Sequence, residues 1–258
     1  IRVNLERNRW VAGNMSDHYI IVNIAAFKVY YLIGHELKFT TNVQVGKTYH
    51  KTPVFKERLR YVEFNPTWTV PVSITRKEIV PKMQKDPAYL DNRNFELLDR
   101  AGNIVPNSQI DYNNLSPTNF PYTIRQKPGP GNALGEVKFI FPNRHSVYLH
   151  DTPSKSLFKK QERTFSHGCI RTQNPLDLAE VLLQGSEWDR EKINETIQTR
   201  KTTRVFPKNN IDVLILYWTA GYYDGEGVGF FKDVYDRDQK VLKQLDNKDQ
   251  RAPKSERK

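Results

Sequence analysis

Short runs of β-branched and aromatic residues, each ended by Gly, Pro or Asn, are the feature that most restricts the fold of this chain. The first run spans residues 19–24, and others follow at 28–32, 37–41, 43–46 and 60–64. Helices need longer apolar patterns at a 3.6-residue spacing, whereas strands are short and rich in these residue types. Runs at such regular intervals predict a β-meander that builds a sandwich or a barrel-like core.

The strand pattern changes character near residue 75. Residues 75–78 read Thr-Arg-Lys-Glu, a capping box that predicts the start of a helix ending at about Gln84. The chain then stays polar and rich in Asn and Asp, with spaced aromatic residues, until about residue 122. We interpret residues 75–122 as an insertion with a small core of its own. It is either a lid over a groove or a long surface excursion without a role.

Strand signals return at residues 136–141 and 146–150, after a stretch rich in Gly and Pro. Two helices are expected next, on the outside of the β core. The first runs from an N-cap at Asn174, with Pro at the first helical position, to Leu183. The second is capped by Ser186 and runs to about Thr199.

The end of the chain contains two more strand signals and a charged tail. Residues 211–220 and 228–234 are expected to pair as a closing hairpin. The prediction for residues 1–240 is therefore a mainly β catalytic core, sandwich- or barrel-like, with peripheral helices and an inserted α-containing lid. Residues 241–258 are too polar and charged to pack, so we expect them to be disordered.

The charge balance is strongly basic, with 40 Lys and Arg against 29 acids and a formal net charge of +11. Such a balance favours anionic partners. The basic residues are scattered without zinc-finger, basic-zipper or RNA-binding signatures, so nucleic acid is not the expected partner. The most apolar run, Ile211–Trp218, is too short for a membrane helix and is expected to be a buried strand. The chain opens with Ile1 and shows no leader pattern, which decides nothing about its compartment.

Cys169 is the only cysteine, so no internal disulfide exists and the thiol needs its own explanation. A lone cysteine is often just a small buried apolar residue. This one follows His167 and Gly168 directly, and His150 lies 169 − 150 = 19 positions upstream. Acyl transfer needs a thiolate, and a neighbouring imidazole lowers a cysteine pKa from about 8.5. The residues thus indicate a cysteine nucleophile with His150 or His167 as its base.

The segments His-Asp-Thr at 150–152 and Ser-His-Gly-Cys-Ile-Arg at 166–171 resemble the signature of the YkuD-like L,D-transpeptidases. One departure from the family pattern is Phe55, because the family often has Gly two residues after the Thr-Pro pair that stands here at 52–53. That difference concerns a loop and leaves the chemistry untouched. Further segments resemble the larger, lid-bearing branch of the family: 45–47, 52–53, 64–66 with Trp68, 132–135 and the closing hairpin.

The resemblance implies a role for each residue of the motif. Cys169 would be the nucleophile and His150 its general base, with the backbone carbonyl of Asp151 orienting the imidazole. Amides near Gly168 and Cys169 would form the oxyanion hole, and glycine there leaves room for a substrate carbonyl. His167 would share a strand face with Cys169 and support the thiolate or the acyl group.

Four residues are candidates for substrate binding, each with a structural alternative. Arg171 either anchors its loop or holds a substrate carboxylate, and Ser166 is expected to shape the loop by hydrogen bonding. Tyr148 lies two residues before His150 on the same strand face, so it points into the same cleft or packs in the core. Trp68 either lines the substrate groove or belongs to the core.

The resemblance implies a peptidoglycan L,D-transpeptidase without a cofactor, located in the periplasm or cell envelope. Cys169 would attack the L-centre carbonyl of diaminopimelate in a stem peptide and release D-alanine. An amine of a second stem would resolve the acyl-enzyme into a 3-3 cross-link, and carbapenems would inactivate the enzyme at Cys169.

Several alternatives stay open. Water in place of the amine would make the protein an L,D-carboxypeptidase. A retained fold without turnover would make it a cell-wall-binding module, and the basic charge leaves a nucleic-acid binder as a further alternative. His150, His167 and Cys169 could instead ligate zinc, although closely spaced ligand pairs are missing.

Overall fold

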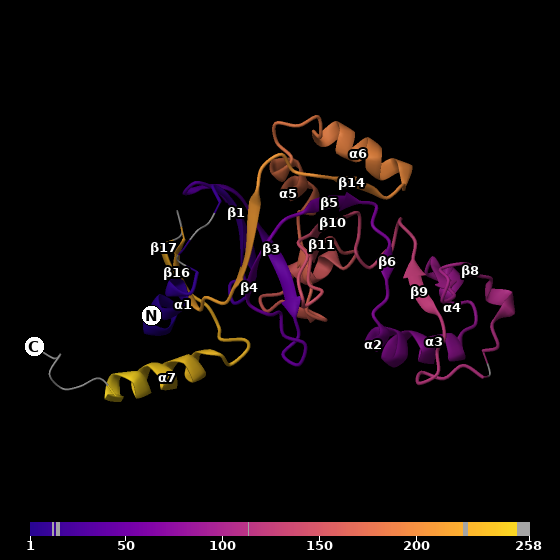
Figure 1. Cartoon of the computed structure of the whole chain (residues 1–258), viewed down its shortest axis with the longest axis horizontal. Helices are drawn as coiled ribbons and strands as arrows, with labels where there is room; N and C mark the ends of the chain where they lie inside the picture. The colour runs from indigo at the N-terminus through magenta and orange to yellow at the C-terminus, as the bar shows by residue number, and fades with distance from the viewer. Residues whose placement is uncertain (12, 14–15, 113, 224–226, 252–258) are drawn as a thin grey trace, which may run out of the picture.

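The main sheet of the protein has 11 strands and curls around a hydrophobic core (Figure 1). The computed structural model describes residues 1–11, 13, 16–112, 114–223 and 227–251. The sheet runs in the order β14-β5-β10-β11-β13-β3-β2-β1-β15-β4, and β12 pairs with β3 outside this path. Its strands are β1 (His18–Asn23), β2 (Lys28–Ile33), β3 (Glu36–Gly46), β4 (Phe55–Arg58), β5 (Tyr61–Phe64), β10 (Val137–Ile140), β11 (Leu149–His150), β12 (Thr164–Ser166), β13 (Ile170–Thr172), β14 (Thr203–Val205) and β15 (Ile211–Leu216).

Contacts between distant strands show how far the sheet curls. Phe55 lies on the edge strand β4, and Phe141 follows β10 near the other end of the sheet. The centroids of these two rings are only 6.2 Å apart. Buried side chains from both halves of the sheet therefore form one hydrophobic cluster, which includes Val22, Val43 and Phe139. The predicted mainly β, sandwich- or barrel-like core is confirmed.

Helices α5 (Pro175–Leu182) and α6 (Arg190–Thr199) cover part of this core. Buried Leu178 of α5 and Ile193 of α6 belong to its cluster. Helix α5 begins at Pro175 after Asn174, as the sequence predicts. Helix α6 begins later than predicted, because Asp189 rather than Ser186 accepts the first-turn amide at 2.9 Å. The Ser186 hydroxyl instead donates to the Leu183 carbonyl, at the end of α5.

A smaller subdomain lies at the end of the molecule away from both chain termini (Figure 1). A hydrophobic cluster of its own fills it, with fully buried Met83 and Leu90. Its sheet includes strands on either side of the expected insertion, so the compact unit spans residues 68–126 rather than 75–122. We call this unit the lid subdomain. Its elements are β6 (Trp68–Thr69), α2 (Val72–Ile74), the π-helical turn η1 (Thr75–Ile79), α3 (Val80–Lys85), α4 (Tyr89–Asn92), β7 (Phe95–Leu98), β8 (Ile104–Val105), the 3-10 turn η2 (Asn107–Gln109) and β9 (Thr123–Gln126).

The helix predicted from the capping box begins three residues earlier than expected. Its first residue is Val72, and the amides of Ile74 and Thr75 both donate to the Pro71 carbonyl at 2.9 Å. Thr75 is thus buried inside the helical segment instead of capping it. The capping-box interpretation was wrong because Pro71 starts the helix before Thr75 is reached.

The closing hairpin also differs from the prediction. Strand β15 lies inside the main sheet, parallel to β1 and antiparallel to β4. The hairpin is formed by β16 (Ala220–Tyr223) and β17 (Gly227–Phe230), and residues 224–226 of its expected turn lie outside the described residues. The continuous apolar run 211–216 fits a strand that is buried on both faces, as β15 is.

The expected disorder of the tail is wrong for residues 241–251, which belong to helix α7 (Asp238–Arg251). Helix α1 (Arg2–Arg9) holds it in place by ion pairs: Arg7 contacts Asp238 at 2.6 Å and Arg2 contacts Asp246 at 2.8 Å. The composition of the tail could not predict these ion pairs, because their partners lie at the other end of the chain. Residues 252–258 lie outside the described residues. No helix among the described residues has the length and apolarity to cross a membrane.

The separate lid core generates a prediction about local stability. Leu90→Ala should loosen the lid subdomain, because truncating a fully buried leucine costs about 2–5 kcal/mol. Hydrogen exchange should accelerate within residues 68–126, while β1, β3 and β15 keep their protection. Val72→Ala, at an exposed lid position, is the matched control. Equal loss of protection in the main sheet would show that the two cores unfold together.

Candidate active site

The pairing of β11 with β13 brings the two halves of the predicted motif together. These strands run parallel, with Leu149 opposite Ile170 and His150 opposite Arg171. The amide of Ile170 donates to the Tyr148 carbonyl at 3.0 Å, so Cys169 comes to lie beside Tyr148. Tyr148, His150, Cys169 and Arg171 all line one cavity of about 360 Å³. We call this the Cys169 cavity.

The loop that presents Cys169 is held by hydrogen bonds on both of its sides. Gly168 has φ +118°, a conformation that favours glycine. The Ser166 hydroxyl accepts from the Gly168 amide at 3.0 Å and donates to the Cys169 carbonyl at 2.5 Å. This is the loop-shaping contact expected of Ser166. It also occupies the Gly168 amide, which leaves the Cys169 amide as the remaining donor for an oxyanion at this turn.

Thr52 and Gly46 fix the same loop from the other side. The Thr52 hydroxyl accepts from the Gly46 amide at 2.9 Å and donates to the Gly168 carbonyl at 2.8 Å. A Cβ at position 46 would lie 3.1 Å from Cα of Gly168 and 2.0 Å from the His50 carbonyl oxygen. Only glycine allows this approach. The Tyr235 hydroxyl completes the support by donating to the Gly46 carbonyl.

His150 is positioned as a neutral base. Its Nδ1 bonds to the backbone carbonyl of Asp151, as the resemblance implied, so Nδ1 carries the proton and Nε2 holds the lone pair. The side chain is 4% exposed. Burial lowers the pKa of His150 to about 3; the charges of Arg171 and Lys138 act in the same direction, and the bond to Asp151 opposes them. The imidazole is therefore uncharged at neutral pH.

The surroundings of Cys169 also favour the uncharged thiol. Burial raises its pKa, and hydrogen bonds from Tyr148 with the charges of Lys138 and Arg171 only partly offset this effect. Its Sγ contacts the Ser146 carbonyl oxygen at 3.7 Å. Burial thus favours the thiol over the expected thiolate. Cys169 and His150 line the same cavity, so a thiol proton would have to move when the nucleophile attacks.

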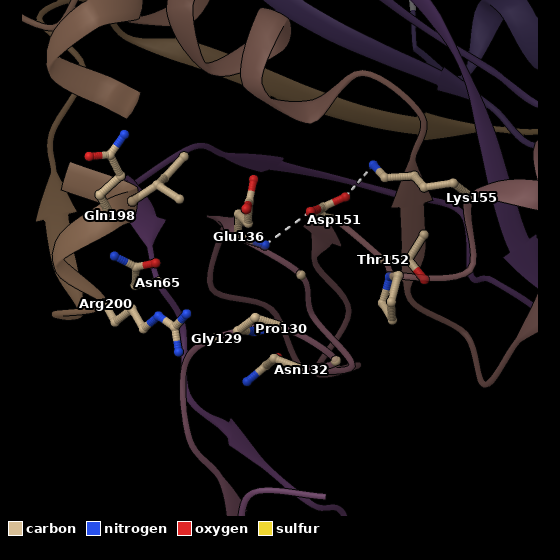
Figure 2. A pocket seen from close by; sticks show the side chains of 14 residues that line it. Asn65, Gly129, Pro130, Asn132, Glu136, Asp151, Thr152, Lys155, Gln198 and Arg200 are labelled. Carbon is tan, nitrogen blue, oxygen red and sulfur yellow. Dashed lines mark hydrogen bonds and ion pairs between the residues drawn. The ribbon is translucent and has the colours of Figure 1, made fainter. Parts of the chain in front are cut away.

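The Asp151 side chain lines a second cavity, of about 510 Å³, whose lining does not include His150 (Figure 2). Its carboxylate accepts from the Glu136 amide at 3.0 Å and from Lys155 Nζ. Gly135, at φ +62°, leaves room for this contact, because a Cβ there would lie 2.5 Å from Cβ of Asp151. Asp151 is therefore anchored through its side chain while its carbonyl holds His150, and its carboxylate plays no part on the Cys169 side.

Two cations lie on or close to the Cys169 cavity: Arg171 lines it, and Lys138, which also interacts with Glu63, interacts with Cys169. Arg171 bonds only to the neutral Gln44 side chain at 3.3 Å, and its buried Nε has no partner among the described residues. Lys138 Nζ lies 4.2 Å from the centroid of the Tyr148 ring. Burial lowers the pKa of Arg171 and of Lys138. A substrate carboxylate, an oxyanion or a thiolate would be stabilised here.

The lid subdomain supplies one wall of the Cys169 cavity. Trp68 lines the cavity and also packs on the lid core, where its ring centroid lies 6.2 Å from that of Phe95. Both roles considered for Trp68 are compatible with this position. Glu78 of η1 contacts His167, with Oε1 and Nε2 2.9 Å apart. His167 is therefore engaged with the lid, whereas His150 is held by Asp151.

Sequence reasoning missed the residues that support this site from a distance. Thr52 and Tyr235 gave no signal beyond a family-like Thr-Pro pair, and Glu78 was assigned to a helix cap. The His50 ring is tilted against that of His167, with centroids 5.2 Å apart, and nothing in the sequence pointed to it. Among the described residues, no three His, Cys, Asp or Glu side chains are grouped to hold a metal, so the zinc alternative has no geometric support.

Comparison with known proteins assigns the family. The model of the YkuD family, described as the L,D-transpeptidase catalytic domain, matches residues 17–202. This range contains the whole Cys169 cavity and the lid subdomain. The chain belongs to this family.

Individual relatives agree with the assignment. A Haemophilus influenzae protein that is assigned by name to the L,D-transpeptidases is 34% identical over 222 residues, covering 86% of this chain and 45% of that protein. This chain thus spans less than half the length of that relative.

Solved structures show a more distant likeness. The catalytic domain of the Enterococcus faecium L,D-transpeptidase acylated by ertapenem shares 14% identity, with a TM-score of 0.36 over 79% of this chain and 100% of that one. L,D-transpeptidase 3 from Mycobacterium tuberculosis with a faropenem-derived adduct shares 12%, with a TM-score of 0.34 over 78% and 60%.

The lowered pKa of His150 predicts a pH-dependent stability. The imidazole of His150 binds a proton near pH 6.5 in the unfolded chain but only near pH 3 in the folded protein. The contribution of neutral His150 to the free energy of unfolding is therefore fully present above pH 6.5 and is lost as the pH falls toward 3. Between pH 7 and pH 5 the unfolding free energy should fall by about 1–2 kcal/mol more than in His150→Gln. Denaturant titrations of both proteins measure the difference. Parallel pH profiles would contradict a buried neutral imidazole.

The two hydrogen bonds of the Thr52 hydroxyl predict that removing this hydroxyl lowers both the stability of the protein and the rate of its reaction. Thr52→Val keeps the shape but leaves the Gly46 amide and the Gly168 carbonyl unpaired, which should cost about 1–3 kcal/mol of stability. The rate of Cys169 acylation should fall as well, because the loop loses its anchor. Thr52→Ser keeps the hydroxyl and is the matched control. If both variants acylate at the wild-type rate, the loop is held by other contacts.

Proposed function

We propose that this chain is a peptidoglycan L,D-transpeptidase domain that works through a Cys169 thioester. The observation that supports this most directly is the set of groups around one cavity: a half-buried thiol, an imidazole with a fixed tautomer and the guanidinium of Arg171. Family membership supports the substrate class, a stem peptide of the cell wall. The combination supplies a nucleophile, a base and an electrostatic site for acyl transfer.

The first half-reaction follows from the neutral resting state. As Sγ of Cys169 attacks the L-centre carbonyl of the donor, Nε2 of His150 takes the thiol proton. Arg171 and Lys138 then stabilise the negative charge, and the Cys169 amide is placed to bind the oxyanion. The imidazolium returns its proton to the departing amine of D-alanine. A thioester remains, and His150 is neutral again.

Arg171 is the substrate-binding residue that we assign to the donor. Its guanidinium faces the cavity without a carboxylate partner, while strand β13 fixes it beside His150. A terminal carboxylate of the donor peptide would satisfy the buried Nε that lacks a partner among the described residues. The structural alternative, a loop anchor, would leave that nitrogen unexplained.

The second half-reaction distinguishes the two enzymatic alternatives. Attack by an amine of another stem gives a 3-3 cross-link, and attack by water gives an L,D-carboxypeptidase. Peptidoglycan lies outside the cytoplasmic membrane, so we also propose a periplasmic or cell-envelope location. No residue of the Cys169 cavity calls for a cofactor in this reaction.

Product analysis tests the proposal directly. A disaccharide-tetrapeptide should yield tripeptide-tetrapeptide dimers by mass spectrometry, and Cys169→Ala should yield none while unfolding at nearly the same temperature. A carbapenem should add one molecule to the wild type, at Cys169 only. Free tripeptide without dimers would indicate the carboxypeptidase. Binding of stem peptide without any product or adduct would indicate a wall-binding module and overturn the proposal.

A further inference from the structure

Glu78 reaches out of the lid subdomain to the loop that carries the nucleophile. Its Oε1 lies 2.9 Å from Nε2 of His167, two residues before Cys169, and both side chains are only partly exposed, at 40% and 36%. Both residues line the Cys169 cavity. The contact therefore joins the lid and the catalytic loop at the place where a second substrate would meet the thioester.

The backbone at Glu78 is unusual. Residues 72–85 form a continuous helical segment, but η1 within it is a π-helical turn, and Glu78 belongs to that turn. Wider turns of this kind are rare and occur frequently at functional sites. The sequence pattern around Glu78 would have used its carboxylate as a helix cap. The structure directs it into the Cys169 cavity instead.

The Cys169 cavity contains charged side chains of both signs, and they come from different residues. Of the described residues that line it, Glu78 is the only carboxylate and Arg171 is the only guanidinium. In the proposed reaction the donor brings a carboxylate, whereas the acceptor brings an ammonium group. Arg171 suits the first and Glu78 suits the second. An ammonium has no lone pair, so an acceptor site needs a proton acceptor as well as a negative charge.

His167 can be that proton acceptor. Its Nε2 faces the Glu78 carboxylate and so carries a proton, which leaves the lone pair on Nδ1. Burial, Lys47 and His50 lower the pKa of His167 and outweigh the opposing effect of Glu78, so the ring is neutral near pH 7. Glu78 and His167 thus form a second oriented base beside Cys169, in addition to His150 with the Asp151 carbonyl.

We propose that Glu78 and His167 form the acceptor site: Nδ1 of His167 takes the first proton from the ammonium of the incoming stem, and the Glu78 carboxylate on Nε2 orients the ring and balances the charge of the imidazolium that forms. This inference rests on the proposed function. The freed lone pair attacks the thioester carbonyl, a C–N bond forms, and the C–S bond breaks when the tetrahedral intermediate collapses. The second proton of the amine reaches the Cys169 sulfur through His150, and the first leaves from His167 to solvent.

This division of labour separates amine transfer from hydrolysis. Water already has a free lone pair, whereas the ammonium must first lose a proton to His167, which forms an imidazolium that the Glu78 carboxylate stabilises. Glu78 should therefore control which nucleophile resolves the acyl-enzyme and should leave its formation unaffected. The carboxylate thus acts through His167 and does not need to touch the ammonium.

Glu78→Gln tests the proposal by comparing two steps in the same protein. D-alanine release in a first turnover, or carbapenem labelling of Cys169, measures acylation and should stay within about twofold of the wild type. Dimer formation from the tetrapeptide should fall about ten- to a hundredfold, as expected for a lost charge-assisted contact. Hydrolysed tripeptide should accumulate in its place. Glu78→Asp should restore part of the transfer.

Two controls exclude a merely structural role. Lys77→Gln changes the exposed neighbour in the same turn and should leave the product ratio unchanged. Hydroxylamine is uncharged at neutral pH, so its attack on the acyl-enzyme should be nearly the same in wild type and Glu78→Gln. If Glu78→Gln slows hydroxylamine as strongly as the peptide acceptor, or keeps the wild-type ratio of dimer to tripeptide, the acceptor site lies elsewhere. Failure of the wild type to release D-alanine would instead refute the proposed function.

Discussion

The parallel pairing of β11 with β13 is the constraint on which the site depends. Two residue pairs in register, Leu149 with Ile170 and His150 with Arg171, are enough to place the base, the nucleophile loop and a cation around one cavity. The connection between these strands must cross over, because parallel neighbours cannot be joined by a tight turn. That crossover contains the second half of the motif, so the spacing in sequence follows from the topology of the sheet.

Desolvation gives this site its chemical character. Burial raises the pKa of Cys169 and lowers that of His150, so it favours the uncharged forms of both groups over an ion pair. In the proposed reaction, Lys138 and Arg171 would stabilise negative charge as it develops on Cys169. Stabilisation that appears during the reaction accelerates it, whereas a preformed thiolate would already use that stabilisation at rest. The site is thus organised for the charge of the reacting state.

The sequence predicted the parts of the site that are local. His150, Asp151, Gly168 and Cys169 lie within short motifs whose spacing carries the information, and the β runs predicted the type of fold. The Thr52 bridge and the contact of Glu78 with His167 depend on residues far apart in the chain, which no local pattern encodes. The capping box failed for a related reason, since Thr-x-x-Glu fits both a helix start and a π-helical turn. Helix α7 escaped prediction because its partners are in α1.

The lid subdomain and the main sheet have separate hydrophobic cores, yet the cavity needs both. In the proposed reaction, Cys169, His150 and Arg171 on the main sheet would form the acyl-enzyme, whereas Glu78 on the lid would act on the second nucleophile. A lid with its own core can change in sequence or position without disturbing the pairing of β11 with β13. If Glu78 acts on the acceptor as proposed, acceptor choice could vary while the acylation chemistry stays fixed, because the two would depend on packing in different cores. The contact between Glu78 and His167 would then couple these two properties.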